Sequence, residues 1–291
     1  MSSNVSIPAH AHDDINPYVP YLATIDEIRD EVTGERAIKT FKLSFKDKEI
    51  QESFTFIPGQ CIMVSVLGEG ECMFAVSSSP TVKDFLEVSV MKLGKVTDAL
   101  HKCEQGDTVG VRGPYGNGFD VEGWKGKNII SIGGGIGQPP LRSLIQYVLA
   151  HRKDYNDIDV IYGARSSKDL CFTKEFQEME KNDEVNVHLS IDVEEKTWDK
   201  FVGFVPDNLL KVAPSPENAV AVTCGPPIMI HFVIQNLVKL GFSDDQIFTT
   251  LEMRMKCGIG KCGRCNIGNV YVCKDGPVFS YSQLQNMKGE R

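Results

Sequence analysis

Four cysteines close to the C-terminus offer the clearest chemistry in the sequence. They are spaced C-x4-C-x2-C-x7-C: Cys257, Cys262, Cys265 and Cys273. Four thiolates this close together can surround one inorganic centre, and the opening spacing is that of plant-type [2Fe–2S] ferredoxins. The interleaved glycines let the backbone turn tightly and direct N–H groups at sulfur, because glycine accepts positive φ. The pattern therefore predicts an iron–sulfur cluster in a chain that moves electrons.

Two other interpretations of these cysteines stay open. A structural zinc ribbon also takes four cysteines, although zinc sites usually pair their ligands at C-x2-C knuckles. Only one such pair is present here. A redox disulfide is the second alternative, and it leaves the clustering of four cysteines unexplained.

A glycine-rich segment, residues 133–140 (GGGIGQPP), follows an apolar run and precedes an amphipathic one. Free N–H groups at the start of a helix bind anions, so this segment suits the pyrophosphate of a nucleotide. It matches neither the G-x-G-x-x-G fingerprint nor a P-loop, and a tight structural turn is the alternative. Its candidate binding residues are Gly133, Gly134, Gly135, Ile136, Gly137, Gln138 and Pro139.

A second loop, Cys224-Gly225-Pro226, stands between a later apolar run and another helical pattern. In a parallel α/β sheet, ligands bind beyond the carboxyl ends of the strands, so both loops are expected at the edge of one crevice. Cys224 would face that crevice with a small polarisable thiol. A buried structural cysteine is the alternative interpretation.

The chain divides into segments whose patterns of apolar and polar residues differ, and these patterns predict the elements that must position the candidate residues. From residue 21 to about residue 118, short alternating runs are separated by Gly, Pro and Asp. This spacing predicts a small antiparallel β-barrel with one helix at 96–101. From residue 127, strand and helix patterns alternate, which predicts a doubly wound parallel sheet. From residue 256 the chain becomes a short module rich in glycine and cysteine.

The composition argues against several classes of protein. A net charge of -8 and a pI near 5.3 are unlike a nucleic-acid-binding protein, which normally shows a basic patch. The sequence shows no apolar run of membrane-spanning length and no signal-peptide pattern. We therefore expect a cytoplasmic protein with reduced cysteines, without a membrane span and without a nucleic-acid partner.

Taken together, these motifs resemble the ferredoxin–NADP reductase-like iron–sulfur flavoproteins. The resemblance is strongest to sulfhydrogenase gamma subunits and to the electron-transfer subunits of anaerobic sulfite reductase and of dihydroorotate dehydrogenase B. It runs from residue 16 to residue 281 and rests on the segments GGGIGQPPLR (133–142), YGARS (162–166), CGPPIM (224–229) and CKDGPVF (273–279). It implies a flexible tail at 1–16, an FAD-binding β-barrel at 17–122, an NAD(P)-binding α/β domain at 123–250 and a [2Fe–2S] module at 251–291, held by the four cysteines.

One segment departs from the family pattern. Members often carry Arg-x-Tyr-Ser where this chain has Cys72-Met73-Phe74-Ala75, so the arginine that would balance the flavin phosphate is absent. The phosphate is then expected at the helix start near Thr97, on Lys95 or on another cation. The FAD contacts that the resemblance implies are Met73, Phe74, Ala75, Val76, Ser77, Val90, Met91, Gly94, Lys95, Val96 and Thr97. For NAD(P) it adds Arg165, Ser166, Cys224, Gly225 and Pro226 to the glycine-rich segment.

The resemblance implies a diaphorase-type electron-transfer subunit. Hydride from NAD(P)H, with its nicotinamide near Cys224, would pass to FAD, and single electrons would then leave through the cluster. The implied partner is a redox complex of the hydrogenase, sulfite reductase or heterodisulfide reductase kind. Arg165 and Lys168 either meet the 2′-phosphate of NADP or are solvated loop charges. Two alternatives stay open: a zinc-stapled nucleotide-binding regulatory protein, and a stand-alone NAD(P)H:ferredoxin-type reductase.

Overall fold

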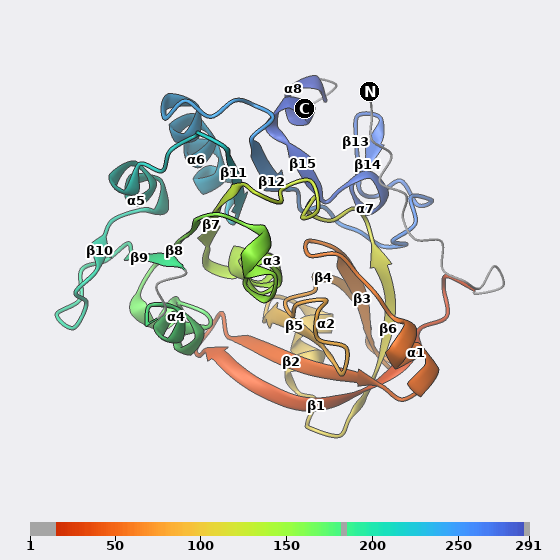
Figure 1. Cartoon of the computed structure of the whole chain (residues 1–291). Coiled ribbons are helices and arrows are strands. Elements are labelled where there is room, and N and C mark those ends of the chain that lie inside the picture. Colours follow the sequence, from red (N-terminus) through yellow and green to blue (C-terminus); the bar gives the residue numbers. More distant parts are fainter. Residues whose placement is uncertain (1–15, 182–184, 288–291) are drawn as a thin grey trace.

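The computed structural model describes residues 16–181 and 185–287. Its N-terminal part is a six-stranded antiparallel sheet (Figure 1). Its strand order is β4-β3-β6-β1-β2-β5. The strands are β1 (Tyr21–Val32), β2 (Ile38–Phe45), β3 (Cys61–Val66), β4 (Gly70–Ala75), β5 (Leu86–Met91) and β6 (Thr108–Tyr115). A bridge between Val76 and Val88 joins the two edge strands, so the sheet curls into the predicted barrel around its own apolar core.

Two short helices interrupt the barrel. Helix α2 (Lys95–His101) lies at the predicted place. Helix α1 (Lys48–Ser53) was not predicted, although Asp47 caps it by accepting hydrogen bonds from its first N–H groups. Strand β3 begins at residue 61, after the chain turns at Gly59, where φ is +95°.

The second sheet has the order β10-β9-β8-β7-β11-β12-β15. Its strands are β7 (Asn128–Gly134), β8 (Ile158–Ala164), β9 (Asn186–Ile191), β10 (Phe201–Val202), β11 (Ala219–Cys224), β12 (Ile247–Thr250) and β15 (Val278–Ser280). All neighbours pair in parallel except β12 and β15. The central strands are continuous apolar runs because both faces of the sheet are covered.

Helices cover both faces of this sheet, as the alternating pattern predicts (Figure 1). Helices α3 (Gln138–Ala150) and α4 (Thr173–Met179) pack on one face, and α5 (Val205–Val212) and α6 (Pro227–Lys239) pack on the other. Helix α5 was not predicted, because its eight residues are too few to give a clear periodic signal. The doubly wound arrangement is confirmed.

The C-terminal segment touches both sheets. It contains β13 (Asn266–Ile267), β14 (Val270–Tyr271), α7 (Val272–Asp275), β15 and α8 (Tyr281–Asn286). Strand β15 extends the second sheet, while Asn117 at the end of the barrel makes two hydrogen bonds with the Val278 backbone, of 2.7 and 2.9 Å. The domain limits 17–122, 123–250 and 251–291 stay predictions, and residues 278–280 belong by hydrogen bonding to the second sheet.

The predicted flexible tail, residues 1–16, lies outside the described residues except for its last position. Across the two described ranges, none of the helices combines the length and the apolar character that crossing a membrane requires.

Candidate functional site

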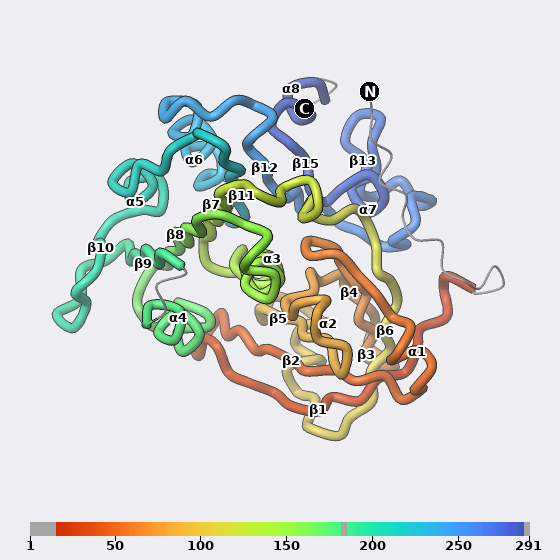
Figure 2. Tube along the Cα trace, in the orientation of Figure 1, coloured from red at the N-terminus to blue at the C-terminus, as the bar shows by residue number. Residues whose placement is uncertain are grey.

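The four clustered cysteines occupy one loop and the short helix that follows it. Cys265 and Cys273 are buried, Cys257 is half-buried, and Cys262 is exposed. Three glycines within this loop have φ between +71° and +78°, a conformation that residues with a Cβ rarely adopt. The loop is therefore a tight turn that buries two of the cysteines and leaves one at the surface. Its backbone is part of the blue C-terminal segment in Figure 2.

Backbone N–H groups point at the sulfurs. Gly260 donates to Cys273 Sγ at 3.2 Å, and two further N–H groups donate to Cys257 Sγ at 3.3 and 3.4 Å. Burial alone would raise the pKa of Cys257, but the backbone donors, led by Ile259, outweigh it and lower the pKa to about 7. At Cys273 burial prevails and raises the pKa to about 12. The donors thus favour a thiolate at Cys257, whereas at Cys273 a bound metal must supply that stabilisation.

The sulfurs fall into two pairs. The Cys257 thiol interacts with that of Cys262, and the Cys273 thiol interacts with that of Cys265 and, with smaller effect, with that of Cys257. In the part of the chain that the structure describes, no three His, Cys, Asp or Glu side chains form a group that could hold a metal ion. A two-iron cluster takes two thiolates on each iron, so two sulfur pairs with N–H donors fit such a group.

The glycine-rich segment forms the turn between β7 and α3, as predicted. A Cβ on Gly137 would lie 2.3 Å from the Cys224 carbonyl oxygen, and one on Gly133 would lie 2.2 Å from Gln138 Oε1. These glycines are required by packing within the protein. Gly135 differs, because it has φ +52° and no atom near the position of its missing Cβ. Its open side is where a nucleotide can approach the backbone.

The two predicted loops do lie together. Gly133 and Cys224 are directly paired in the parallel register of β7 and β11, so both loops leave the same edge of the sheet. Within the segment, the Gln138 side chain is buried and both of its polar atoms lack a partner among the described residues. Both loops therefore lie at one edge of the sheet, and the buried Gln138 amide lies within the first of them.

Cys224 lies at this sheet edge, near enough to Cys61 of the barrel for the two thiols to interact. Thr250 Oγ1 donates to Cys224 Sγ at 2.9 Å, yet burial prevails and raises the pKa of Cys224 to about 11. Its thiol also interacts with that of Cys61 in β3, whose pKa burial raises to about 12. Cys61 pairs directly with Ala75, at the end of the predicted flavin strand. A protonated thiol thus lies between the nucleotide loops and that strand, suited to positioning rather than to nucleophilic attack.

The predicted flavin contacts gather on β4, β5 and α2. Phe74 packs partly against the barrel core, and Val76, Ser77 and Val90 are buried. The Ser77 N–H donates to the Glu87 carbonyl oxygen. The Thr97 hydroxyl accepts hydrogen bonds from the N–H groups of Leu93 and Gly94, so it caps α2. These assignments stay predictions, together with those of Met73, Met91 and Val96.

Lys95 was expected to help with the flavin phosphate. In the structure its ammonium is exposed and pairs with Glu69 at 3.2 Å, an interaction that a phosphate would have to replace. Arg165, the predicted partner of a 2′-phosphate, is exposed at the end of β8 near Asp192, and the Ser166 hydroxyl donates to Asp169 at 2.6 Å.

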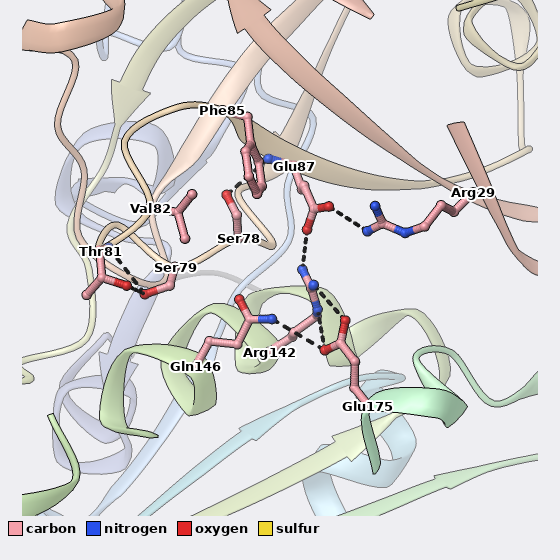
Figure 3. A pocket seen from close by; sticks show the side chains of 10 residues that line it. All are labelled: Arg29, Ser78, Ser79, Thr81, Val82, Phe85, Glu87, Arg142, Gln146 and Glu175. Carbon is pink, nitrogen blue, oxygen red and sulfur yellow. Dashed lines mark hydrogen bonds and ion pairs between the residues drawn. The ribbon is translucent and has the colours of Figure 1, made fainter. Parts of the chain in front are cut away.

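A buried charge network, not predicted from the sequence, joins the barrel to α3 (Figure 3). Arg142 bonds Glu87 at 2.6 Å and Glu175 at 2.7 and 2.8 Å, and it also donates to the Ser77 carbonyl at 2.9 Å. Burial alone would raise the pKa of Glu87, but Arg142 and Arg29 outweigh it and hold the pKa below its usual value. The network lines a cavity of about 400 Å³ and fixes the helix that carries the glycine-rich segment.

Arg112 is a second functional candidate that the sequence did not reveal. It lies on β6 and is buried, and its guanidinium reaches the Cys257 carbonyl oxygen at 3.4 Å. The only hint in the sequence is that each of these arginines interrupts an otherwise apolar run, TVGVRG and PPLRSLI. A buried charge must be paired, but its partners are distant in sequence.

Three family models match consecutive parts of the chain. The oxidoreductase FAD-binding domain matches residues 28–119, the oxidoreductase NAD-binding domain matches 132–235, and the iron-sulfur cluster binding domain of dihydroorotate dehydrogenase B matches 252–285. The chain therefore has a binding domain for FAD, for NAD and for an iron–sulfur cluster, in the predicted order.

Curated relatives match over nearly the whole chain. Sulfhydrogenase 1 subunit gamma of Pyrococcus furiosus is 39% identical over 280 residues, which cover 94% of this chain and 95% of the relative. A probable electron transfer subunit of dihydroorotate dehydrogenase B (NAD(+)) from Methanocaldococcus jannaschii is 31% identical and covers 91% of each chain.

Solved structures share the fold. An NADH-dependent reduced ferredoxin-NADP oxidoreductase superposes with a TM-score of 0.70 at 22% identity, covering 92% of this chain and 94% of the other. A cytochrome P450 reductase from Amycolatopsis gives a TM-score of 0.67 at 22% identity, covering 79% and 68%. The chain belongs to the ferredoxin–NADP reductase-like iron–sulfur flavoproteins, in the group of sulfhydrogenase gamma subunits and dihydroorotate dehydrogenase B electron-transfer subunits.

Proposed function

We propose that this chain is the diaphorase-type subunit of a larger redox complex. It takes hydride from NAD(P)H at the crevice between its two sheets and releases single electrons through a [2Fe–2S] cluster held by Cys257, Cys262, Cys265 and Cys273. The observation that carries the proposal is spatial. The nucleotide loops meet the predicted flavin strand at Cys224 and Cys61, and the cysteine loop rests on the same barrel through Arg112.

The bound flavin supplies the conversion of a two-electron hydride into single electrons, and the cluster supplies a one-electron exit. The chain's own residues supply placement. The open backbone at Gly135 receives the pyrophosphate, and Cys224 holds the nicotinamide against the flavin strand as a neutral thiol. The buried contacts around α3 exclude water from behind the crevice.

Electrons leave at the exposed end of the cysteine loop. Cys262 is exposed there, and the same segment carries four exposed cations, here called the basic collar: Arg254, Lys256, Lys261 and Arg264. None of these four forms an ion pair with another described residue. This basic collar in a chain of net charge -8 suits a partner with an acidic face around its own acceptor.

The names of the relatives support a partner of sulfhydrogenase or dihydroorotate dehydrogenase type. Sulfite reductase-like and heterodisulfide reductase-like partners remain further proposals from the resemblance alone. A stand-alone reductase is the second candidate, and native purification decides it, because full physiological turnover by the isolated chain would remove the need for a partner. Nine free cysteines support a reducing location such as the cytoplasm.

Anaerobic rapid mixing with NADH or NADPH tests the route. In the parent protein, bleaching of the flavin absorbance is expected to be followed by bleaching of the cluster absorbance. Cys265→Ser should keep the first phase and lose the second. Cys103→Ser is the matched control, because this half-buried cysteine lies outside the loop and outside the predicted flavin contacts, and it should leave both phases unchanged. Two unchanged phases in Cys265→Ser would contradict the proposal.

A further inference from the structure

Arg112 connects the barrel to the cysteine loop through one buried side chain. Its side chain is 4% exposed, and Glu71 accepts from it at 2.7 Å through Nη2 and at 3.3 Å through Nε. Its Nη1 donates to the Tyr115 hydroxyl at 2.9 Å, to the Pro17 carbonyl at 3.0 Å and to the Cys257 carbonyl at 3.4 Å. The two-point contact with a carboxylate fixes the plane of the guanidinium.

The cysteine loop is seated on this arginine and its neighbour. A Cβ on Gly258 would lie 2.8 Å from the Tyr115 ring, so the loop backbone packs directly on the ring. Gly258 also has φ +78°, which disfavours any other residue there. The backbone at and after the first predicted ligand, Cys257, therefore contacts both Tyr115 and Arg112.

Arg112 also lies in a row of paired strand positions. It pairs with Met63 on β3, and Met63 pairs with Met73 on β4. Residues directly opposite each other on neighbouring strands project from the same face of a sheet. The row therefore runs from the side of the cysteine loop to the predicted flavin strand, so Arg112 connects the two sites across neighbouring strands.

A buried positive charge at this place favours electrons on a nearby cluster. Reduction adds one negative charge, and a guanidinium with little exposure to water acts through a low local dielectric. Glu71 opposes this effect, but its side chain is 36% exposed, so water screens it more strongly than it screens Arg112. The pair therefore leaves a net positive influence on the cluster side.

We propose that Arg112 sets the reduction potential of the iron–sulfur cluster and fixes the cysteine loop at its distance from the flavin. The inference rests on the proposed function, since it needs the cluster to be present. Arg112 is a positioning and tuning residue, because it reaches the ligand's backbone and not the iron.

The test is an anaerobic redox titration of the purified protein, followed by the EPR signal of the reduced cluster. Arg112→Met should lower the midpoint potential, and Glu71→Gln should raise it. Arg112→Lys keeps the charge and should stay close to the parent. Arg254→Met is the matched control, because it removes an exposed cation from the same module and should shift the potential less than Arg112→Met.

The charge effect is supported if Arg112→Met and Glu71→Gln shift the midpoint potential in opposite directions while iron and sulfide content stays at the parental level. A merely structural role would not give shifts of opposite sign for the two variants. Unchanged potentials, or shifts of both variants in the same direction, overturn it. If Arg112→Met fails to assemble the cluster, Glu71→Gln decides alone, and an absent or downward shift overturns the inference. A parent protein without any cluster signal instead overturns the proposed function.

Discussion

Replacing Arg142 by Met tests whether the buried charge network holds the glycine-rich segment against the barrel. The change removes the side chain that joins Glu87, Glu175 and the Ser77 carbonyl. Removing one partner of a buried ion pair typically costs about 3–5 kcal/mol, because it leaves the other charge buried and uncompensated. Glu87 is 5% exposed but keeps Arg29 at 2.5 Å, so we expect the lower end, about 3 kcal/mol.

The assay is urea unfolding followed by tryptophan fluorescence, in parallel with the NAD(P)H concentration that gives half-maximal flavin reduction. Arg29→Met is the matched control. It removes the more exposed partner of the same carboxylate and should cost about 1 kcal/mol. Arg142→Met should also weaken NAD(P)H binding, because α3 carries the segment proposed to bind the pyrophosphate. A loss below about 1 kcal/mol with unchanged binding would refute the reasoning.

The same variant should become more sensitive to acid. The pKa of Glu87 is held below its usual value when the chain is folded, so its charge stabilises the fold above the unfolded pKa, near 4.5. That stabilisation is lost as the pH falls through the lower folded pKa. Without Arg142, burial raises the pKa of Glu87, so the loss should begin at a higher pH. Denaturation midpoints between about pH 3 and pH 6 measure this shift.

Three further predictions concern the crevice and the electron exit. Gly137→Ala places a Cβ 2.3 Å from the Cys224 carbonyl oxygen, so it should raise the dissociation constant for NAD(P)H at least about tenfold by titration, a loss of about 1.4 kcal/mol. The pKa of Cys224 is raised to about 11, so the rate of flavin reduction by NAD(P)H should show no thiol titration between about pH 6 and pH 9. Electron transfer to an acidic ferredoxin should slow as salt increases, and Lys261→Glu should reduce that salt dependence.

Each of these three predictions can be contradicted by a specific result. Gly126 has positive φ with open space around it and lies away from the crevice, so Gly126→Ala should leave nucleotide affinity unchanged. Equal losses in the two glycine variants would mean that the Gly137 contact does not govern binding. A flavin-reduction rate that changes with a pKa near 8 would contradict a protonated Cys224. If the rate of electron transfer to ferredoxin did not depend on salt, the basic collar would not be part of the surface from which electrons leave.

The chemistry of the chain could be predicted where it is local in sequence. The four cysteines, the turn at residues 133–140 and the loop at Cys224 each lie within a few consecutive residues, and their strand–loop–helix contexts follow from apolar periodicity. The antiparallel barrel and the doubly wound parallel sheet follow from the same patterns, whereas the strand orders and the antiparallel β15 do not. Helix α1 is short and depends on a single cap at Asp47, so periodicity gave no signal for it.

The interfaces could not be predicted, because their partners are far apart in the chain. Arg112 reaches Glu71 on another strand of the barrel and Cys257 in the C-terminal segment, and Arg142 of the second sheet's helix α3 reaches Glu87 of the barrel. Lys95 looked available for a phosphate, but its Glu69 partner lies on a different turn. A single sequence does not show which charged residues pair in the fold. An arginine inside an apolar run indicates only that a buried partner exists.

The most direct measurement is metal analysis with EPR on the anaerobically purified chain before and after addition of NAD(P)H. The account predicts FAD together with about two iron and two acid-labile sulfide per chain, and a reduced-cluster signal that appears with the nucleotide and disappears in Cys265→Ser. One zinc per chain without sulfide, or flavin reduction that never produces a cluster signal, would contradict it.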